Sequence, residues 1–196
     1  MKTTLSAWFL LPALLTTALP LRAAVPPPGI QSGDLIFRDG GEAISDIVRS
    51  IDSSGFSHVG VVDITPEGTY VIHATPQEHP GGISGVNRDP LDFFIQHAKD
   101  GLVTWYAVQA DSEHHRRARD NALARLGTPF SINPQDGLYC TQLAADAWQS
   151  AGVTIITGKT RLSLPLAEEP LILPENMTRS PQLRRIPQYR PPRGGN

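Results

Sequence analysis

Cysteine is almost missing from this chain: Cys140 is the only one among its 196 residues. A single thiol excludes an intramolecular disulfide framework, and it excludes zinc or iron–sulfur sites built from several cysteines. An excess of positive charge is missing too, since 17 Lys and Arg stand against 19 Asp and Glu. This balance argues against a nucleic-acid-binding protein, which needs a basic face.

Long apolar runs are missing everywhere except near the N-terminus. Residues 5–21 are largely apolar, follow the positive Lys2, contain two prolines and lead to small residues suited to cleavage. These features predict a signal peptide over residues 1–23, because a membrane anchor needs about 20 consecutive apolar residues. We therefore expect an exported protein of the bacterial periplasm or cell envelope, with no transmembrane anchor after cleavage.

The rest of the chain predicts one domain between two short flanking segments. Residues 24–32 hold three consecutive prolines and are expected to form an extended linker. Residues 188–196 combine Arg, Pro and Gly without an acidic residue, which predicts a flexible basic tail. Residues 33–187 form a segment long enough to bury a hydrophobic core of its own.

The apolar pattern of this domain predicts both strands and helices. Strands are expected at 35–37, 59–64, 69–73 and 102–108, and helices at about 43–51, 91–98, 112–127 and 138–152. Asp89 and Ser112 are expected to cap the second and third of these helices. A turn centred near Pro66 and Glu67 makes a hairpin in which the numbers of facing residues sum to about 133. The order of elements predicts an α+β domain with an antiparallel sheet.

Cys140 lies near the start of the last of these helices, on the stripe that faces inward. A thiol there is close to the positive end of the helix dipole and to unpaired backbone N–H groups. Both favour the reactive thiolate, and the same amides can hold a developing oxyanion. The alternative is a small core hydrophobe, a common role for free cysteine. Position alone leaves both interpretations open.

Two of the six histidines, His58 and His73, lie on opposite strands of the hairpin. Their numbers sum to 131, so they are expected to be near neighbours at its open end. This arrangement suits a general base and the group that orients it. A metal site is not expected, because we find no third ligand close in sequence, and no cofactor is predicted. His114 and His115 lie in a charged helix start and are expected on the surface.

Five short motifs carry a family resemblance. The chain reads Gly33-Asp-Leu-Ile-Phe, Phe56-Ser-His-Val-Gly-Val-Val, Tyr70-Val-Ile-His-Ala, Gly127-Thr-Pro-Phe-Ser and Leu138-Tyr-Cys-Thr-Gln-Leu. With His before Cys, this order resembles the permuted papain-like cysteine hydrolases of the NlpC superfamily, the YiiX/YaeF-like group, which are related to lecithin retinol acyltransferases. The resemblance implies a circularly permuted papain-like fold, in which an antiparallel sheet packs against a cysteine-bearing helix.

The resemblance also implies roles for individual residues. Cys140 is the nucleophile, and its backbone N–H helps to hold the oxyanion; His58 is the general base and acid; His73 orients His58. Many bacterial members have a carboxylate where this chain has His73, and Thr141-Gln142 replaces the commoner Ser-Glu. Tyr139, Asp34 and Ser57 are expected to line the substrate site, although packing also suits Tyr139 and a turn suits Asp34.

Three functions remain for comparison. The first is an exported cysteine amidase or peptidase that forms an acyl-thioester on Cys140, with a peptidoglycan peptide as a candidate substrate. The second is an esterase, thioesterase or acyltransferase acting on lipids, which His73 suggests. The third is a catalytically inactive binding module of the cell envelope. The expected partner is an acyl or amide substrate, and no nucleic acid is expected.

Overall fold

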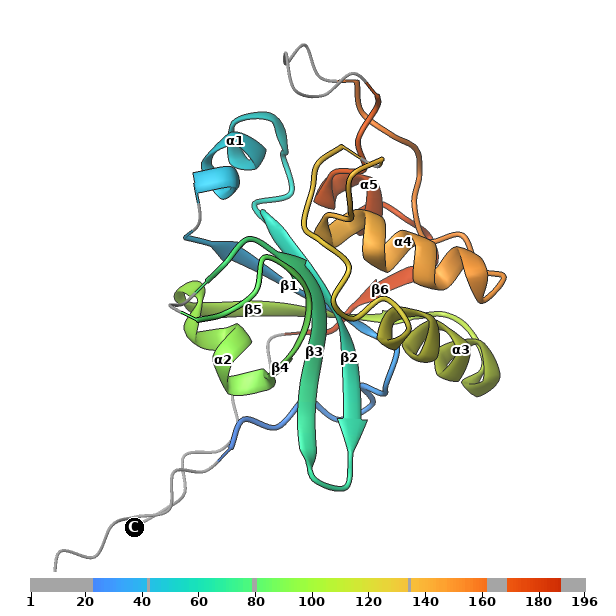
Figure 1. The fold of residues 1–196 in the computed structure, drawn as a ribbon. Helices are drawn as coiled ribbons and strands as arrows, with labels where there is room; N and C mark the ends of the chain where they lie inside the picture. Colours follow the sequence, from blue (N-terminus) through green and yellow to red (C-terminus); the bar gives the residue numbers. More distant parts are fainter. Residues whose placement is uncertain (1–22, 42, 79–80, 134, 162–168, 188–196) are drawn as a thin grey trace, which may run out of the picture.

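A six-stranded antiparallel sheet forms the centre of the domain (Figure 1). This computed structural model describes residues 23–41, 43–78, 81–133, 135–161 and 169–187. The strand order is β4-β3-β2-β1-β5-β6. The strands are β1 (Leu35–Gly40), β2 (His58–Thr65), β3 (Gly68–Thr75), β4 (Gly85–Pro90), β5 (Ala98–Val108) and β6 (Leu183–Arg185). The predicted signal peptide, except for its last residue, and the predicted basic tail lie outside the described residues.

Five helices accompany the sheet in the described part of the chain. They are α1 (Ala43–Ile51), α2 (Leu91–Gln96), α3 (Ser112–Leu123), α4 (Cys140–Ser150) and α5 (Pro174–Thr178). The expected α+β class, with an antiparallel sheet packed against the cysteine-bearing helix, is confirmed. Strand β4, helix α5 and strand β6 were not expected from the sequence. No described helix has the length and apolar character that crossing a bilayer requires.

The β2–β3 hairpin has the predicted register. Val61 faces Ile72 and Thr65 faces Gly68, so the numbers of facing residues sum to 133. The turn is set by local chemistry, and a one-residue slip would move every side chain to the other face of the sheet. Because the buried faces of both strands are apolar, the hairpin keeps this register.

The two faces of the sheet carry separate clusters of buried side chains. Val59 and Val61 of β2 pack with residues of α3 and α4, whereas Val62 packs with Leu91 and Phe94 of α2. Neighbouring residues of a strand point to opposite faces, so this alternation follows from strand geometry. Helices α3 and α4 therefore cover one face, and α2 covers the other (Figure 1).

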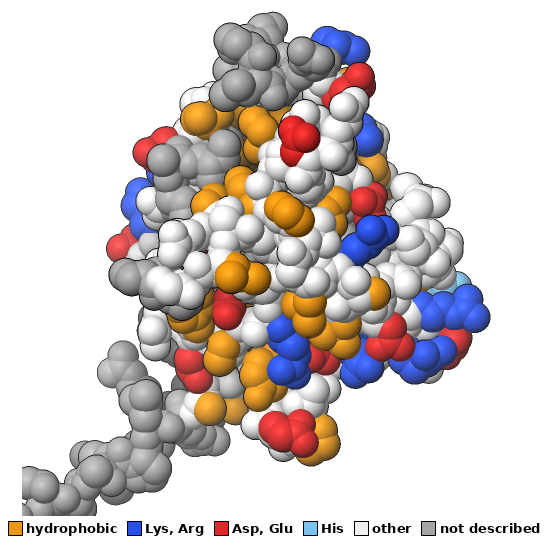
Figure 2. All heavy atoms as spheres, in the orientation of Figure 1, with side chains coloured by type: hydrophobic (Ala, Val, Ile, Leu, Met, Phe, Trp, Pro, Cys, Tyr) orange, Lys and Arg blue, Asp and Glu red, His pale blue; other side chains and the backbone are white. Residues whose placement is uncertain are grey.

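Helix starts differ in detail from the predicted ones. Helix α4 begins at Cys140 rather than at residue 138, and Tyr139 is its N-cap. Helix α3 is capped by Asp111, whose carboxylate accepts the His114 N–H at 2.9 Å, and Ser112 is its first residue. The outer side of α3 carries both positive and negative side chains (Figure 2). Arg116 forms ion pairs there with Glu113 and Asp120, one turn away on either side.

The proline-rich segment 24–32 lies against the domain. The Ala24 N–H donates to the Asp92 carboxylate at 2.9 Å, and Ile30 is buried in the cluster under α2. The segment contains no helix or strand, as three consecutive prolines require.

Candidate active site

The two hairpin histidines form a direct hydrogen bond. His58 Nε2 lies 2.8 Å from His73 Nδ1, which confirms that they are near neighbours. Both rings are buried, and they meet edge to face with centroids 5.0 Å apart. His73 faces Gly60 across the hairpin rather than His58, so the pair is diagonal.

Gly60 makes room for this pair. A Cβ atom at that position would lie 2.2 Å from a Val71 methyl carbon and 3.3 Å from the His73 Cβ. No side chain larger than hydrogen fits without moving the neighbouring strand. The Phe56-Ser-His-Val-Gly-Val-Val motif therefore supplies both the His58 ring and the space beside His73.

Asp89 extends the pair to three residues. His73 Nε2 lies 3.0 Å from Asp89 Oδ2, so both ring nitrogens of His73 are bonded to side chains. The expectation that Asp89 caps α2 is wrong: Pro90 is the N-cap, and no side chain caps this helix. Asp89 belongs to β4, next to β3, and its carboxylate points to the face that carries His73.

His58 is buried under α2. Phe94 packs against both rings, with centroids 5.7 Å from His58 and 5.3 Å from His73. Burial, together with the positive charge of Arg38 and the neighbouring His73, holds the pKa of His58 well below its ordinary value. His58 is therefore a neutral imidazole at neutral pH, and it can accept a proton from a thiol.

A buried ion pair adjoins the two histidines. Arg38 of β1 is fully buried, pairs with Glu78, and donates to the Phe94 carbonyl at 3.0 Å. One ligand atom each of His58, His73 and Glu78 lies within 4.8 Å of the other two. Glu78 follows His73 by five residues and is a third potential metal ligand, which the sequence pattern alone did not reveal.

Cys140 is the first residue of α4 and is partly exposed. The loop before it is braced by the Gly127-Thr-Pro-Phe-Ser segment: the Leu138 N–H donates to the Pro129 carbonyl at 2.9 Å. Gly137 allows this close approach, because a Cβ there would lie 2.1 Å from the Pro129 oxygen. Two of the five motifs thus fix where the cysteine helix begins.

Cys140 and the histidine pair are held by different groups of residues. Cys140 packs against the cluster that joins α4 to Val59, whereas the contacts that hold His58 are made on the α2 side with His73 and Phe94. Helix α4 begins toward the end of the sheet at which β2 starts (Figure 1). The pairing of Cys140 with His58 therefore rests on the family resemblance and stays a prediction.

The residues after Cys140 serve α4 itself. Thr141 is buried and donates to the Ile172 carbonyl at 2.6 Å, and the Gln142 amide donates to Asp146 at 2.5 Å. Tyr139 is buried as well; its hydroxyl accepts the Ile172 N–H at 3.0 Å and lies 3.3 Å from Gln142 Oε1. Burial raises the pKa of Tyr139 to about 12. Its contacts are those of a packing residue.

The other two expected substrate-site residues are buried and bonded to the backbone. The Asp34 carboxylate accepts the Gln31 and Val108 N–H groups, each at 2.8 Å, and burial raises its pKa above the ordinary value. The Ser57 hydroxyl accepts the Gly40 N–H at 2.7 Å. Asp34 therefore anchors the start of β1, and Ser57 ties the start of β2 to the end of β1.

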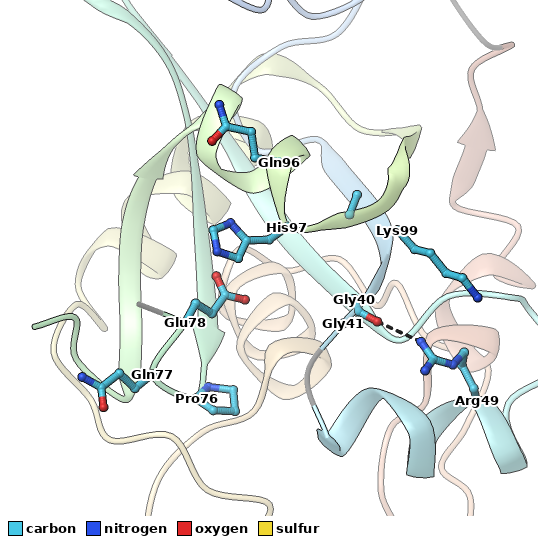
Figure 3. Close-up of a pocket in the computed structure, with 10 residues that line it drawn as sticks. Gly40, Gly41, Arg49, Pro76, Gln77, Glu78, Gln96, His97 and Lys99 are labelled. Carbon is cyan, nitrogen blue, oxygen red and sulfur yellow. Dashed lines mark hydrogen bonds between the residues drawn. The ribbon is translucent and has the colours of Figure 1, made fainter. Parts of the chain in front are cut away.

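A pocket opens beside the ion pair (Figure 3). It has a volume of about 860 Å³, and its lining includes Gly40, Arg49, Glu78, His97 and Lys99. Figure 3 shows Glu78 and His97 pointing into the same space. Because a carboxylate oxygen of Glu78 lies within 4.8 Å of a ring nitrogen of each histidine, this pocket adjoins the histidine cluster at Glu78.

A family described as "Permuted papain-like amidase enzyme, YaeF/YiiX, C92 family" matches residues 29–187. The uncharacterized protein YiiX of Escherichia coli (strain K12) is 24% identical over 126 residues, which are 62% of this chain and 58% of YiiX. This chain thus aligns with a little more than half the length of that relative. A crystal structure titled metalloprotein yiiX, from Escherichia coli O157:H7, has a TM-score of 0.68 at 23% identity, over 82% of this chain and 98% of that one. This likeness shows a shared fold.

Proposed function

This chain belongs to the permuted papain-like amidase family of YaeF and YiiX, and from that premise we propose that it is an exported cysteine hydrolase. It cleaves an amide bond through an acyl-thioester on Cys140. The observation that carries the proposal is the hydrogen-bonded chain from His58 through His73 to Asp89. Such a chain is what a general base needs in order to hold one ring orientation and one tautomer.

The direction of these hydrogen bonds follows from Asp89. An ionised carboxylate only accepts, so the His73 Nε2–H donates to Asp89, and His73 Nδ1 carries a lone pair. That lone pair accepts the His58 Nε2–H. The basic lone pair of His58 is then on Nδ1, the nitrogen that His73 does not use. His73 thus orients His58 without supplying or removing a proton.

The proposed reaction has two steps. His58 Nδ1 takes the Cys140 thiol proton as the sulfur bonds to the acyl carbon, and the imidazolium then gives that proton to the leaving amine. Water, deprotonated by His58, adds to the thioester, and the acid leaves as the sulfur regains its proton. The oxyanion of each step is held by backbone N–H groups at the start of α4, including that of Cys140. Because His58 is neutral before reaction, we expect a thiol–imidazole ground state at neutral pH.

Amide substrates of the cell envelope suit this proposal best. The N-terminal pattern predicts export, and peptidoglycan peptides are the abundant amides of that compartment. A lipid esterase, thioesterase or acyltransferase shares the same first step, because a thioester forms from amide and ester alike. The leaving group separates these functions, so both classes belong in one assay.

The test uses the purified full chain, Cys140→Ala and a matched control, His114→Ala, whose imidazole lies on the outside of α3. Each is incubated with a muropeptide mixture and, separately, with short-chain acyl esters. We expect turnover of the muropeptides by the wild type and by His114→Ala, and none by Cys140→Ala. Full turnover by Cys140→Ala would contradict the cysteine mechanism. Ester turnover alone would favour the lipid-hydrolase alternative.

Alkylation with iodoacetamide addresses the inactive binding module. In the thiol–imidazole ground state His58 takes the thiol proton during the attack, so Cys140 should be alkylated faster in the wild type than in His58→Ala. An equal rate in these two proteins, together with no turnover of either substrate class, would favour a binding module.

A further inference from the structure

We propose that His58, His73 and Glu78 bind one divalent transition-metal ion of the zinc class, and that the bound ion switches the hydrolase off by taking the ring nitrogen that links His58 to His73. Two imidazoles and one carboxylate are a ligand set that zinc uses in proteins, with a water molecule as the fourth ligand. The binding stands on the geometry of the described residues alone. The inhibition rests, in addition, on the proposed function.

The outer contacts of the cluster resemble those of known metal sites. A histidine that binds a metal usually donates its other ring N–H to a carboxylate, which fixes the ring and raises the basicity of the ligating nitrogen. His73 does this through Nε2, 3.0 Å from Asp89 Oδ2, while its Nδ1 points to His58. The partner that orients the His73 ring is therefore already in place.

Two cavities adjoin the cluster at Glu78. A cavity of about 20 Å³, the size of one water molecule, is lined by Thr75, Glu78 and Asp89 among others. The Thr75 hydroxyl is buried and has no hydrogen-bond partner among the described residues, so it can bond a water ligand. The larger pocket of about 860 Å³ shares Glu78 as part of its wall and offers an entry path (Figure 3).

Two adjustments accompany binding. Zinc bonds nitrogen at about 2.0–2.1 Å in a tetrahedron, so two ligating nitrogens stand about 3.3 Å apart. The His58 and His73 nitrogens are 2.8 Å apart, and the rings must separate by about 0.5 Å. Glu78 can keep Arg38 on one oxygen and bond the ion through the other, because a carboxylate accepts at both.

The ion removes the base from the reaction. With the metal on Nε2, His58 no longer donates to His73, and its ring is held by the ion rather than by the His73–Asp89 pair. The ring proton then moves from Nε2 to Nδ1, so Nδ1 has no lone pair with which to take the thiol proton. Turnover should therefore fall in proportion to the fraction of chains that hold an ion.

The binding test titrates Zn²⁺ into chelator-treated full chain by calorimetry. We expect one ion per chain for the wild type and for two controls, Cys140→Ser and His97→Ala, which remove the thiol and a pocket imidazole. Glu78→Gln should weaken the affinity by about tenfold or more, and His73→Ala should abolish binding. Equal affinity for wild type and Glu78→Gln, or loss of binding in Cys140→Ser, would overturn the site.

Two further measurements keep the result independent of folding. Co²⁺ bound to the wild type should give the d–d absorption of a four-coordinate site and no sulfur-to-cobalt charge-transfer band. A charge-transfer band would show that the ion binds Cys140, which would contradict the site. Zn²⁺ should suppress wild-type turnover, a chelator should restore it, and Glu78→Gln should need about tenfold more metal. Turnover that rises with Zn²⁺ would overturn the inhibition. A chain that binds no metal but still depends on Cys140 would overturn this inference alone.

Discussion

Two buried histidines of this domain each lie beside a carboxylate, and they differ in what their rings contact. His73 places both ring nitrogens on side chains, His58 and Asp89. Both ring nitrogens of His115 lie against backbone carbonyls: Nδ1 is 3.2 Å from the Ser32 oxygen, and Nε2 is 3.0 Å from the Val108 oxygen. Its carboxylate neighbour, Asp34, is 3.8 Å away. His115 was expected on the surface, and that expectation is wrong, since only 2% of the residue is exposed.

The ring partners distinguish a histidine that can take part in catalysis, His73, from one that stabilises the fold, His115. Backbone carbonyls are fixed acceptors, so a ring bonded to two of them ties chain segments together. His115 joins α3 to the segment before β1 and to the end of β5, with Trp148 of α4 against its edge. Side-chain partners can change protonation or position, so the His73 chain can serve chemistry. Burial and a nearby carboxylate alone do not distinguish the two.

The largest expected effect comes from removing His58, the first residue of the hydrogen-bonded series His58–His73–Asp89. His58→Ala should lower kcat/KM by about 10²–10⁴-fold, because it removes the general base. The midpoint of thermal unfolding should fall as well, because loss of the buried ring leaves a cavity beside Phe94, and kcat/KM is therefore compared per folded molecule. Steady-state kinetics and a melting curve check both halves. His114→Ala is the matched control, and a His58→Ala variant with near-normal kcat/KM would contradict the assignment.

The second prediction concerns the other buried histidine, His115. His115→Ala should lower the free energy of unfolding by about 2–4 kcal/mol, because the buried ring that bridges the Ser32 and Val108 carbonyls is lost and a cavity forms. Urea denaturation measures this change. Activity per folded molecule should remain within about twofold of the wild type, as expected for a residue outside the site. If kcat falls while stability holds, His115 would belong to the chemistry and the comparison would fail.

The third prediction concerns the carboxylate behind His73. Asp89→Ala should lower kcat by about 10–100-fold with little change in KM, because His73 loses the partner that fixes its tautomer. Asp89→Asn keeps an acceptor oxygen and should lose less. Asp92→Asn is the control, since the Asp92 carboxylate accepts the Ala24 N–H on the same side of the domain. A change confined to KM would instead indicate substrate contact by Asp89.

Local chemistry explains which features the sequence predicts. The hairpin register follows from one turn and two apolar strands, so the proximity of His58 and His73 can be derived by counting. The inward stripe of α4 likewise follows from helical spacing. Asp89 and Glu78 could not be found this way, because their roles depend on how β4 and the segment after β3 lie beside the pair. Asp89 also fits the pattern of a helix cap, so two local explanations compete for one residue.

The distance between Cys140 and His58 is a further relation that no local pattern fixes. It depends on how α4 is set against the sheet, which the loop around Pro129 and Leu138 controls. The order of the motifs implies the pairing, whereas the contacts of the two residues differ: Cys140 packs against the cluster that contains Val59, and His58 packs on Phe94. Local sequence predicts where a helix starts, whereas its position over a sheet depends on contacts between residues far apart in the chain.

The smallest expected effect tests Tyr139, the residue next to the nucleophile. Tyr139→Phe should lower the free energy of unfolding by about 1–2 kcal/mol, because the buried Ile172 N–H loses its acceptor while the ring stays packed. KM should be unchanged, since a hydroxyl bonded to Ile172 and Gln142 is turned to the protein rather than to a ligand. Thr141→Val is the matched control, because it removes another buried hydroxyl that is bonded to the same residue. A rise in KM for Tyr139→Phe alone would return Tyr139 to the substrate site, and the rule that backbone-bonded side chains hold the fold would have an exception beside Cys140.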